Sequence, residues 1–564
     1  MPDILLIQPP IRDFYLTAKR TIPYGLAGIA SPLISAGYSV EILDALASTR
    51  TKKEDLPPEM SFLRDFYSGP DISPFSLFHD FRRFGFSEKA IGERIRNSGA
   101  FLAGISSLFT AYGAEALRAA EMVKGLCPKT LTVLGGHHPT EMPEEVLRHD
   151  CVDFIIRGEG EISMMLLARA IRGGVPLESV PGIGFRTSGG KFFVRPPAVL
   201  TDLEDVPFPA IDLIDKSFYR RSKRPCAVIA AGRGCPLTCS YCSIGCSSWC
   251  SFRMKSVPRV IEEIKHAVFG IGARFIDFED ENISCRREWF LDLLNEMERQ
   301  FKGCGLELRA MNGLFPPTLN EEVICAMKAA GFTALNLSLC TTSREQLRKF
   351  RRPDVRAEFE RSLLWAQKYG LEAVAYIIVG APGQDPKDSV ADLLFLADKS
   401  AIAGVSVFYP SPGSADFKKC AAKDLLPPAL SQYRSTALPL SDSTTRKDSI
   451  TLLRLGRMLN FFKSLDPAGW QEVLNLAEEH DIETRKFRIA EVLSGAETHA
   501  AKRLAIGKEL LGIFLRDGTI YGVSPQGSMF RHMVSGGLCD EFRSGMLKLY
   551  PIFNQSRVLE TIRS

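Results

Sequence analysis

Three cysteines stand close together near the middle of the chain, Cys235, Cys239 and Cys242, within Gly232-Arg-Gly-Cys-Pro-Leu-Thr-Cys-Ser-Tyr-Cys-Ser243. Three thiolates can bind three corners of a [4Fe–4S] cluster, because cluster iron is held by Cys thiolates. The fourth iron then lacks a protein ligand, so a small molecule can chelate it. The alternative is a structural zinc or redox-sensing site that adds Cys246 or a His as a ligand.

The segment that must position these thiols, residues 225–415, alternates strand and helix patterns. Apolar residues at helical spacing predict an amphipathic helix after the Cys loop, with Ser256 as its N-cap and Pro258 in its first turn. The Cys loop directly follows the first strand, at the strand end where α/β barrels carry their active sites. We predict six strands, at Cys226–Ala231, Phe275–Glu279, Glu307–Met311, Ala334–Leu339, Ala373–Val379 and Gly404–Tyr409.

Residues 1–200 also alternate strands with helices, which predicts a doubly wound, Rossmann-like parallel sheet. The predicted strands are Asp3–Gln8, Ser39–Leu43, Phe101–Ser106, Leu131–Leu134 and Val152–Ile156, and the helices are Tyr24–Ala36, Ala111–Leu126 and Ile162–Arg172. Ligands of such sheets bind at the carboxyl ends of the strands. This rule places Pro9, Pro10, Ser106, Ser107, Gly135 and Gly136 at the edge of a binding site.

The Cys spacing, with Tyr241 directly before the third Cys, resembles the signature of radical S-adenosylmethionine (SAM) enzymes. The resemblance implies a partial (β/α)6 barrel and a [4Fe–4S] cluster held by Cys235, Cys239 and Cys242. It also implies that the open iron binds the amino and carboxylate groups of SAM, with Tyr241 nearby. Such enzymes reduce SAM to methionine and a 5′-deoxyadenosyl radical.

Two further segments resemble motifs of the same family. Phe278-Glu-Asp-Glu-Asn-Ile283 resembles an acidic motif near SAM, which makes Asp280 and Glu281 candidate cofactor contacts. Adjacent carboxylates at a strand end are costly without partners. Arg309 lies in the third strand, where the family often has a basic residue.

The turn Gly380-Ala-Pro-Gly-Gln384 resembles a family motif whose backbone packs near the adenine, so Gly380, Pro382 and Gly383 are further candidates. The chain departs from the family at two places. Cys340-Thr341 stands where a Glu-Ser pair is usual, and Gln384 replaces a Glu. These departures leave the contacts to SAM open.

Four segments resemble the cobalamin-binding domain that precedes many radical SAM domains: Ile4–Pro10, Gly135–Thr140, Val152–Glu161 and Asp202–Ala210. The resemblance implies cobalamin contacts at Pro10, Ser106, Gly135, Gly136, Gly158 and Glu159. Glycines let the backbone approach a large flat cofactor.

The Asp-x-His-x-x-Gly motif that supplies an axial His to cobalt in other cobalamin proteins is absent, as is common in the radical SAM branch. Cobalamin is therefore expected to bind without a protein imidazole. His137 and His138 are the only paired histidines, and we interpret both as loop residues satisfied by the backbone.

The remaining segments carry weaker signals. Residues 45–98 form an aromatic-rich insertion, interpreted as a small helical cap with its own core, with a substrate lid as the alternative. Residues 201–224 are expected to be a linker. Residues 416–564 are expected to form a mainly helical C-terminal domain that shapes the substrate cavity. Cys246 and Cys250 are interpreted as structural, with an auxiliary cluster or a thiol acid as alternatives.

Composition sets outer limits. The chain has 564 residues, enough for several domains, and a net charge of +4 gives no argument for nucleic acid or an anionic membrane. No run approaches the roughly 18 apolar residues of a membrane span, and the amino terminus is interpreted as a strand, not a signal peptide. The 14 cysteines favour metal or redox chemistry over disulfides in a cytoplasmic protein.

The leading hypothesis from these resemblances is a cobalamin-dependent radical SAM enzyme, with a [4Fe–4S] cluster, SAM and cobalamin as cofactors. It would methylate an unactivated carbon of a small-molecule or lipid-like substrate and take electrons from a flavodoxin or ferredoxin-type donor. The alternative is radical cyclisation, rearrangement or dehydrogenation without methyl transfer. The sequence does not identify the substrate.

Overall fold

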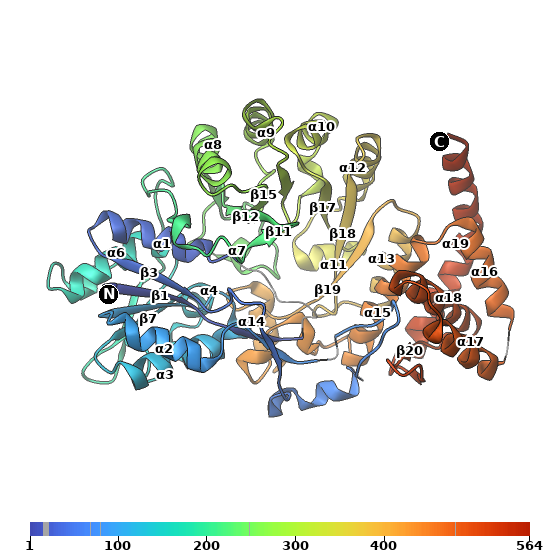
Figure 1. Cartoon of the computed structure of the whole chain (residues 1–564), viewed down its shortest axis with the longest axis horizontal. Helices are drawn as coiled ribbons and strands as arrows, with labels where there is room; N and C mark the ends of the chain where they lie inside the picture. Colours follow the sequence, from blue (N-terminus) through green and yellow to red (C-terminus); the bar gives the residue numbers. More distant parts are fainter. Residues whose placement is uncertain (15–21, 68, 79, 248, 480, 564) are drawn as a thin grey trace.

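The computed structural model describes residues 1–14, 22–67, 69–78, 80–247, 249–479 and 481–563. Figure 1 shows an N-terminal α/β part in blue and teal, a part built of strands and outer helices in green and yellow, and a helical C-terminal part in orange and red. The predicted succession of a Rossmann-like domain, a barrel and a mainly helical region is confirmed.

The N-terminal sheet is parallel through its five central strands. Their spatial order is β3 (Val40–Asp44), β1 (Ile4–Gln8), β6 (Leu102–Ser106), β7 (Leu131–Gly135) and β8 (Phe154–Ile156). The antiparallel strands β9 (Ile183–Arg186) and β10 (Phe192–Val194), which the sequence did not predict, extend the sheet beyond β8. The chain order reverses between β1 and β6, and ligands of doubly wound sheets bind at such a switch point.

Helices cover both faces of this sheet (Figure 1). On one face α1 (Tyr24–Ser35) packs beside α6 (Gly160–Ile171), and α2 (Glu88–Ser98) packs beside α3 (Gly113–Leu126) on the other. The apolar residues of the two faces fall into separate buried clusters. Two-sided burial explains why these strands are nearly continuous apolar runs.

All six strands predicted for the second part are present in the described residues. They are β12 (Arg224–Ile229), β15 (Phe275–Phe278), β16 (Glu307–Arg309), β17 (Ala334–Cys340), β18 (Glu372–Val379) and β19 (Ile402–Val407). The first three pair in parallel, as do the last three, and isolated bridges such as Leu314 to Leu337 join the halves. The outer layer contains α8 (Val257–Lys265), α9 (Arg287–Phe301), α10 (Glu321–Ala330), α12 (Arg356–Lys368) and α13 (Pro386–Ala397) (Figure 1).

Helix α8 begins as its sequence predicts. The Ser256 hydroxyl accepts a hydrogen bond from the backbone N–H of Arg259 at 3.3 Å, and Pro258 lies in the first turn. Val260, Ile261 and Ile264 are buried on the face that meets the strands. Capping and patterning therefore fix the element that directly follows the Cys loop.

The C-terminal region consists mainly of α15 (Arg446–Lys463), α16 (Pro467–Glu478), α17 (Ile482–Ser494), α18 (His499–Asp517) and α19 (Gly536–Arg563). A short hairpin of β20 (Tyr521–Val523) and β21 (Met529–Arg531) interrupts the helices. The region is thus mainly helical, as predicted.

The expectation that the insertion at residues 45–98 has its own core is wrong, because its aromatic residues pack against the C-terminal region. Phe75 meets Phe461 edge to face, with ring centroids 5.4 Å apart, and the Tyr67 hydroxyl donates to the Thr436 carbonyl at 2.7 Å. The backbone N–H of Ile72 donates to the Val523 carbonyl at 2.9 Å. The insertion therefore joins the first and last parts of the chain.

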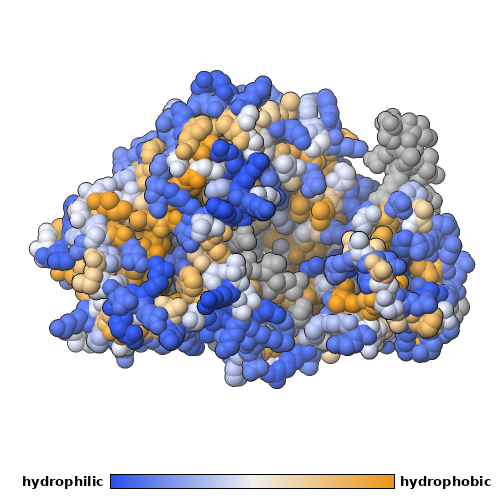
Figure 2. All heavy atoms as spheres, in the orientation of Figure 1, coloured by the Kyte–Doolittle hydropathy of each residue, from blue (hydrophilic) through white to orange (hydrophobic). Residues whose placement is uncertain are grey.

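The visible surface is mainly hydrophilic over the outer helices, and apolar atoms gather on the N-terminal part near α1 and α6 (Figure 2). In the described parts of the chain, no helix is both long enough and apolar enough to span a membrane.

Candidate active site

The three cysteines lie on a loop whose two ends are paired. After β12, the short strand β13 (Gly232–Arg233) pairs antiparallel with β14 (Arg253–Met254), and the helical turn α7 (Ser243–Cys246) lies between them. A Cβ atom at Gly234, where φ is +77°, would lie 2.6 Å from the Ser251 carbonyl oxygen. Only glycine fits there, so the loop closes tightly beneath the thiols.

Each of the three sulfurs accepts one hydrogen bond from a different part of the loop's surroundings. The Asn282 amide donates to Cys235 Sγ at 3.9 Å, Arg352 Nη1 to Cys239 Sγ at 3.7 Å, and the Gly245 N–H to Cys242 Sγ at 3.5 Å. Donors to sulfur tune cluster potentials. Apart from the place of Asn282 in the acidic motif, no sequence pattern pointed to Asn282 or to Arg352.

Burial raises the pKa of Cys235, and it raises the pKa of Cys242 to about 11. Binding iron must therefore displace a proton from these thiols. Within the described ranges, no three His, Cys, Asp or Glu side chains lie close enough to share one metal ion. Three thiols that each bind a separate iron of one cluster do not need that proximity, so the donor set fits a [4Fe–4S] cluster.

The two predicted acidic residues have different environments. Asp280 is buried, and its carboxylate accepts the backbone N–H groups of Ala231 at 3.0 Å and Gly232 at 2.6 Å. It therefore holds the start of the Cys loop, and a contact of Asp280 with a cofactor stays a prediction. Glu281 accepts the N–H of Gly234 at 3.1 Å and does line the adjoining space.

Tyr241 packs against the barrel, and its place near SAM stays a prediction. Its ring packs edge to face on Phe350, with centroids 4.9 Å apart, and its hydroxyl lies 3.9 Å from Cys340 Sγ. Cys340 is buried and has φ of +74°, beside an irregularity in the pairing of β17 with β18. Cys340, which stands where the family usually has Glu, thus lies at the strained carboxyl end of β17.

Hydrogen bonds hold the turn at residues 380–384 in place. The Gln384 side chain accepts from the Ala381 N–H at 3.0 Å and donates to the Ile378 carbonyl at 2.9 Å. The Gly383 N–H donates to Asp442 at 2.7 Å, and Gly380 has φ of +77°. Gln384 can thus hold the turn where the family has Glu, while the adenine contacts of Gly380, Pro382 and Gly383 stay predictions.

Arg309 pairs with Asp277 on the neighbouring strand, with Nε 3.0 Å from Oδ2. Its guanidinium also lies over the Phe275 ring, 5.1 Å from the centroid. These contacts hold the Arg309 side chain against the neighbouring strand β15. A contact between Arg309 and a cofactor stays a prediction.

A cavity of about 370 Å³, here called the glycine-rich cavity, extends from the carboxyl edge of the N-terminal sheet to the Cys loop. A Cβ atom at Gly25 would meet nothing within 4 Å, and one at Gly135 would meet only the Ile156 carbonyl oxygen at 3.9 Å. This bare backbone leaves room for a flat macrocycle, so the residues present fit cobalamin. The lining includes the predicted residues Ser106, Gly135, Gly136, Gly158 and Glu159.

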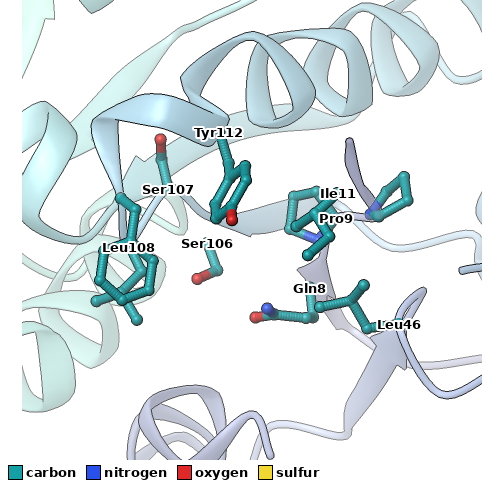
Figure 3. Close-up of a pocket in the computed structure, with 10 residues that line it drawn as sticks. Gln8, Pro9, Ile11, Leu46, Ser106, Ser107, Leu108 and Tyr112 are labelled. Atoms are coloured by element: carbon teal, nitrogen blue, oxygen red, sulfur yellow. The ribbon is translucent and has the colours of Figure 1, made fainter. Parts of the chain in front are cut away.

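The edge of that cavity is the switch point of the sheet. Figure 3 shows Gln8 from the end of β1 and Ser106 from the end of β6 pointing into the same space, with Tyr112 facing Pro9. Pro10 lines the same recess. The rule for doubly wound sheets thus brings together residues about 100 positions apart in the chain.

Glu159 also forms part of a largely buried ion-pair network that we call the interdomain clamp (Glu159, Glu161, Arg233 and Arg253), and its contact with cobalamin stays a prediction. Arg253 Nη2 lies 2.6 Å and Nη1 3.0 Å from the two Glu159 oxygens. Arg233 Nη1 lies 3.4 Å from both Glu159 and Glu161. Burial alone would raise the pKa of Glu159, but the Arg253 hydrogen bonds and the Arg233 charge bring it below its usual range.

The clamp connects the two domains at the cluster loop itself. Both arginines belong to the paired strands β13 and β14 that enclose the Cys loop, and both carboxylates belong to the N-terminal domain. This role could not be predicted from the sequence, because ion-pair partners 72 and 94 residues apart leave no local pattern.

The paired histidines differ, which corrects the common interpretation given to both. His138 is satisfied, with Nδ1 2.8 Å from the Ser107 hydroxyl and Nε2 3.0 Å from Glu145. Nδ1 of His137 is buried and has no hydrogen-bond partner among the described residues. Burial lowers the pKa of His137, so its imidazole is neutral. His137 lines the glycine-rich cavity and also a second one.

The second cavity, here called the junction cavity, has a volume of about 380 Å³. The loop after β6, α4 (His137–Glu141), α7, the turn after β19 and the segment Tyr433–Thr436 all contribute to its wall. It shares Leu108, His137, Ile244 and Glu281 with the glycine-rich cavity. The two cavities therefore meet beside the Cys loop.

Cys246 and Cys250 take different places at this loop. The Cys246 thiol donates to the Cys239 carbonyl at 3.2 Å, which supports a structural role. Cys250 lines the glycine-rich cavity. All 14 cysteines are free thiols in the structure, and no disulfide occurs in the part of the chain it describes.

Two domain families match the chain. The Radical SAM superfamily matches residues 229–396, and the B12 binding domain matches residues 79–168. The Cys loop and most of the six barrel strands lie in the first match. The sheet edge from β6 to β8 lies in the second.

Several curated proteins are similar over most of their length. An uncharacterized methyltransferase of Pyrococcus horikoshii is 26% identical over 431 residues, which cover 75% of this chain and 84% of that protein. A cytidylyl-2-hydroxyethylphosphonate methyltransferase of Streptomyces wedmorensis is 24% identical, covering 77% and 84%. A hopanoid C-3 methylase of Methylococcus capsulatus is 26% identical, covering 73% and 71%.

Two solved structures share the fold. The cobalamin-dependent SAM radical enzyme OxsB, with aqua-cobalamin and SAM bound, has a TM-score of 0.63 at 13% identity, covering all of this chain and 81% of that one. The radical SAM methyltransferase TsrM of Kitasatospora setae, with cobalamin and a [4Fe–4S] cluster bound, has a TM-score of 0.58 at 17% identity, covering 91% and 99%.

Proposed function

The chain is a radical SAM enzyme with an upstream B12-binding domain, and we propose that it methylates a carbon atom of a small molecule bound in the junction cavity. Its two domains imply a [4Fe–4S] cluster, SAM and cobalamin as cofactors. When bound, the cluster supplies the electron that splits SAM, and cobalamin carries the methyl group.

The overall conversion replaces a C–H bond with a C–CH3 bond. Two SAM molecules and two electrons are consumed. One SAM becomes S-adenosylhomocysteine as its methyl group leaves. The other becomes methionine and 5′-deoxyadenosine, which keeps the hydrogen taken from the substrate.

The chain's own residues hold and orient the reacting partners. In this proposal Cys235, Cys239 and Cys242 bind three irons, and Glu281 and the turn at Gly380–Gly383 contact SAM. Gly135, Gly136 and Ser106 border the space for cobalamin. Asp280 holds the start of the Cys loop, and the interdomain clamp fixes that loop against the N-terminal domain. The C-terminal segment Tyr433–Thr436 forms part of the wall of the junction cavity.

The shared wall of the two cavities carries the proposal. A methyl acceptor must be reached both by the radical, which arises at the Cys loop, and by the methyl donor in the B12-binding domain. The junction cavity borders α7 of the Cys loop on one side and the glycine-rich cavity on another. A substrate bound there can be served from both directions.

We further propose a flavodoxin or ferredoxin-type protein as the electron donor and the cytoplasm as the compartment. The 14 free thiols support a reducing compartment, where disulfides are rare.

Anaerobic reconstitution with iron and sulfide tests the cluster assignment. We expect broad absorbance near about 400 nm, where thiolate-bound iron–sulfur centres absorb, and 5′-deoxyadenosine when SAM and a reductant are added. Cys239→Ala should lose both, whereas Cys325→Ala, at an exposed cysteine, should keep both. Zinc in place of iron, or SAM cleavage that survives in Cys239→Ala, would contradict the proposal.

Product analysis distinguishes methyl transfer from its alternative. A methylated product with two SAM consumed per turnover supports the proposal. Formation of 5′-deoxyadenosine with a cyclised, rearranged or dehydrogenated product that has gained no methyl group would instead establish other radical chemistry at the same site.

A further inference from the structure

The polar wall of the junction cavity restricts what it can bind. The lining includes the hydroxyls of Ser243, Ser411, Thr110, Tyr409 and Tyr433, along with Glu141 and Glu281. A hydrocarbon skeleton placed against these groups would leave them without partners, at about 1–3 kcal/mol for each unsatisfied group. The cavity volume of about 380 Å³ lies within the range of about 300–1,000 Å³ for small-molecule pockets.

Arg434, the arginine in this wall, already has hydrogen-bond and ion-pair partners. Arg434 donates through Nε to the Ser431 carbonyl at 2.6 Å and through Nη1 and Nη2 to the carbonyls of Arg12 at 2.6 Å and Ala111 at 2.8 Å. Nη1 also lies 3.2 Å from Asp13. Among the described lining residues no other Lys or Arg side chain occurs, so these residues offer an anionic group no free cation.

Glu141 has an acceptor to spare. One of its oxygens accepts from Trp249 Nε1 at 3.2 Å, and no ion pair to Glu141 occurs among the residues that the structure describes. A Cβ atom at Gly413 would lie 2.5 Å from Glu141 Oε2. Only the absence of a side chain at position 413 leaves room for this carboxylate. Burial raises the pKa of Glu141, although the Trp249 hydrogen bond and the charges of Arg157 and Lys418 act in the opposite direction.

His137 provides a second, independent sign of a ligand. Its ring lies 6.4 Å from the Trp249 ring, and its buried Nδ1 has no partner in the described ranges. The residue lines both cavities. A neutral imidazole nitrogen in such a place needs a hydrogen-bonding partner. Glu141 and His137 thus form one polar corner of the junction cavity, and Trp249, which lines the glycine-rich cavity, donates to Glu141 beside it.

We propose that this corner recognises the methyl acceptor through a hydrogen-bond-donating group, an amine or hydroxyl, and that the cavity rejects carboxylates, phosphates and hydrocarbon skeletons. The inference rests on the proposed function only for the identity of the ligand as the methyl acceptor. A buried carboxylate and an aromatic ring suit a cationic amine best.

Equilibrium dialysis of three matched probes against the anaerobically reconstituted enzyme tests this. The probes are 2-phenylethylamine, 2-phenylethanol and phenylacetate, with saturating SAM present and no reductant, so that the SAM site is filled and no cleavage occurs. We expect the amine to bind at least about tenfold more tightly than phenylacetate, with the alcohol in between.

Glu141→Gln should reduce the preference for the amine over phenylacetate at least about tenfold. Glu144→Gln, at an exposed carboxylate three positions away, is the matched control and should keep the preference. Gly413→Ala, which displaces the carboxylate without changing its charge, should weaken the amine as well.

Equal or tighter binding of phenylacetate to the unaltered enzyme would overturn the inference without any variant. So would an unchanged preference in folded Glu141→Gln, or no binding of any probe. Formation of 5′-deoxyadenosine from SAM is measured separately, without a probe, so failure of the radical SAM assignment can be distinguished from failure of this specificity.

Discussion

The two cavities that meet at His137 are built in different ways. The glycine-rich cavity is lined mostly by strand ends and turns of one parallel sheet, with bare backbone at positions such as Gly135. The junction cavity is lined by side chains from segments as far apart as Asp13 and Thr436. A cavity bordered by bare backbone suits a cofactor that many enzymes share. A cavity lined by side chains from distant segments can differ in substrate specificity from one enzyme to the next.

Substitutions in the interdomain clamp should have the largest effect, because the clamp joins the N-terminal domain to the Cys loop that borders both cavities. Charge reversal in Glu159→Arg leaves Arg253 without its carboxylate partner and places a like charge beside Arg233, which keeps Glu161. Breaking a buried pair costs about 3–5 kcal/mol. We expect a loss of that size in the free energy of unfolding, measured by denaturant titration of the reconstituted protein.

The double variant Glu159→Arg/Arg253→Glu should recover part of the loss, since the pair is restored with reversed polarity. Glu178→Arg, at an exposed carboxylate of the same domain, is the control. If single and double variants lose the same amount, the clamp does not couple the two domains.

The glycine-rich cavity should bind cobalamin less tightly when a side chain fills part of it. Gly135→Leu introduces a side chain where a Cβ atom meets only the Ile156 carbonyl, so the fold should tolerate it. We expect at least about a tenfold loss of cobalamin affinity, measured by the cobalamin retained after gel filtration, with iron content unchanged.

Gly125→Leu, at an open position on α3 away from the cavity, should retain cobalamin. Retention by Gly135→Leu as well would place cobalamin elsewhere.

The Cys loop borders both cavities, and its electrostatics should respond to Arg352. Replacing this cation by Gln removes a charged donor to the Cys239 sulfur. The reduced cluster carries the more negative charge, so its reduction potential should fall by about 60–120 mV, corresponding to roughly 1.5–3 kcal/mol in a one-electron couple. Redox titration followed by electron paramagnetic resonance measures the shift.

Arg348→Gln, on the exposed face of α11 (Arg344–Phe350), should leave the potential unchanged. An unchanged potential in Arg352→Gln would show that this side chain does not act on the cluster.

Substitution of Asp44 should have the smallest effect on SAM cleavage, because Asp44 lines neither cavity. Its carboxylate accepts hydrogen bonds from the Tyr219 hydroxyl and the Leu46 N–H, and burial raises its pKa to about 6. The folded state therefore binds this proton more tightly than the unfolded state. That stabilisation is fully present below about pH 3.8 and is lost as pH rises through about 6.

Asp44→Asn should therefore gain stability relative to the unaltered protein, by on the order of 1 kcal/mol, as pH rises from 4 to 7. SAM cleavage should not change. Parallel pH profiles of the unfolding free energy for the two proteins would contradict the assignment.

The elements of both α/β domains could be predicted from the sequence because their information is local. Runs such as Phe275–Glu279 and Leu131–Leu134 are apolar and bounded by turns, and the Ser256 cap is visible from its position before Pro258. The spacing of Cys235, Cys239 and Cys242 identified the centre of the site for the same reason.

The contacts that decide roles at the site are long-range, and here prediction from the sequence was weaker. Asp280 was chosen for its charge, yet its partners are two backbone N–H groups 48 and 49 residues earlier. His137 and His138 are neighbours with the same side chain, but only His138 faces Ser107 and Glu145. No local pattern distinguishes them.

The central claim is that one enzyme serves a single substrate from two cofactor sites, and the fate of SAM tests it most directly. S-adenosylhomocysteine and 5′-deoxyadenosine are quantified together after anaerobic reduction of the reconstituted enzyme with SAM. We predict both products from the unaltered enzyme, and 5′-deoxyadenosine alone from Gly135→Leu. Failure of the unaltered enzyme to form either product, or unchanged formation of S-adenosylhomocysteine by Gly135→Leu, would contradict the account.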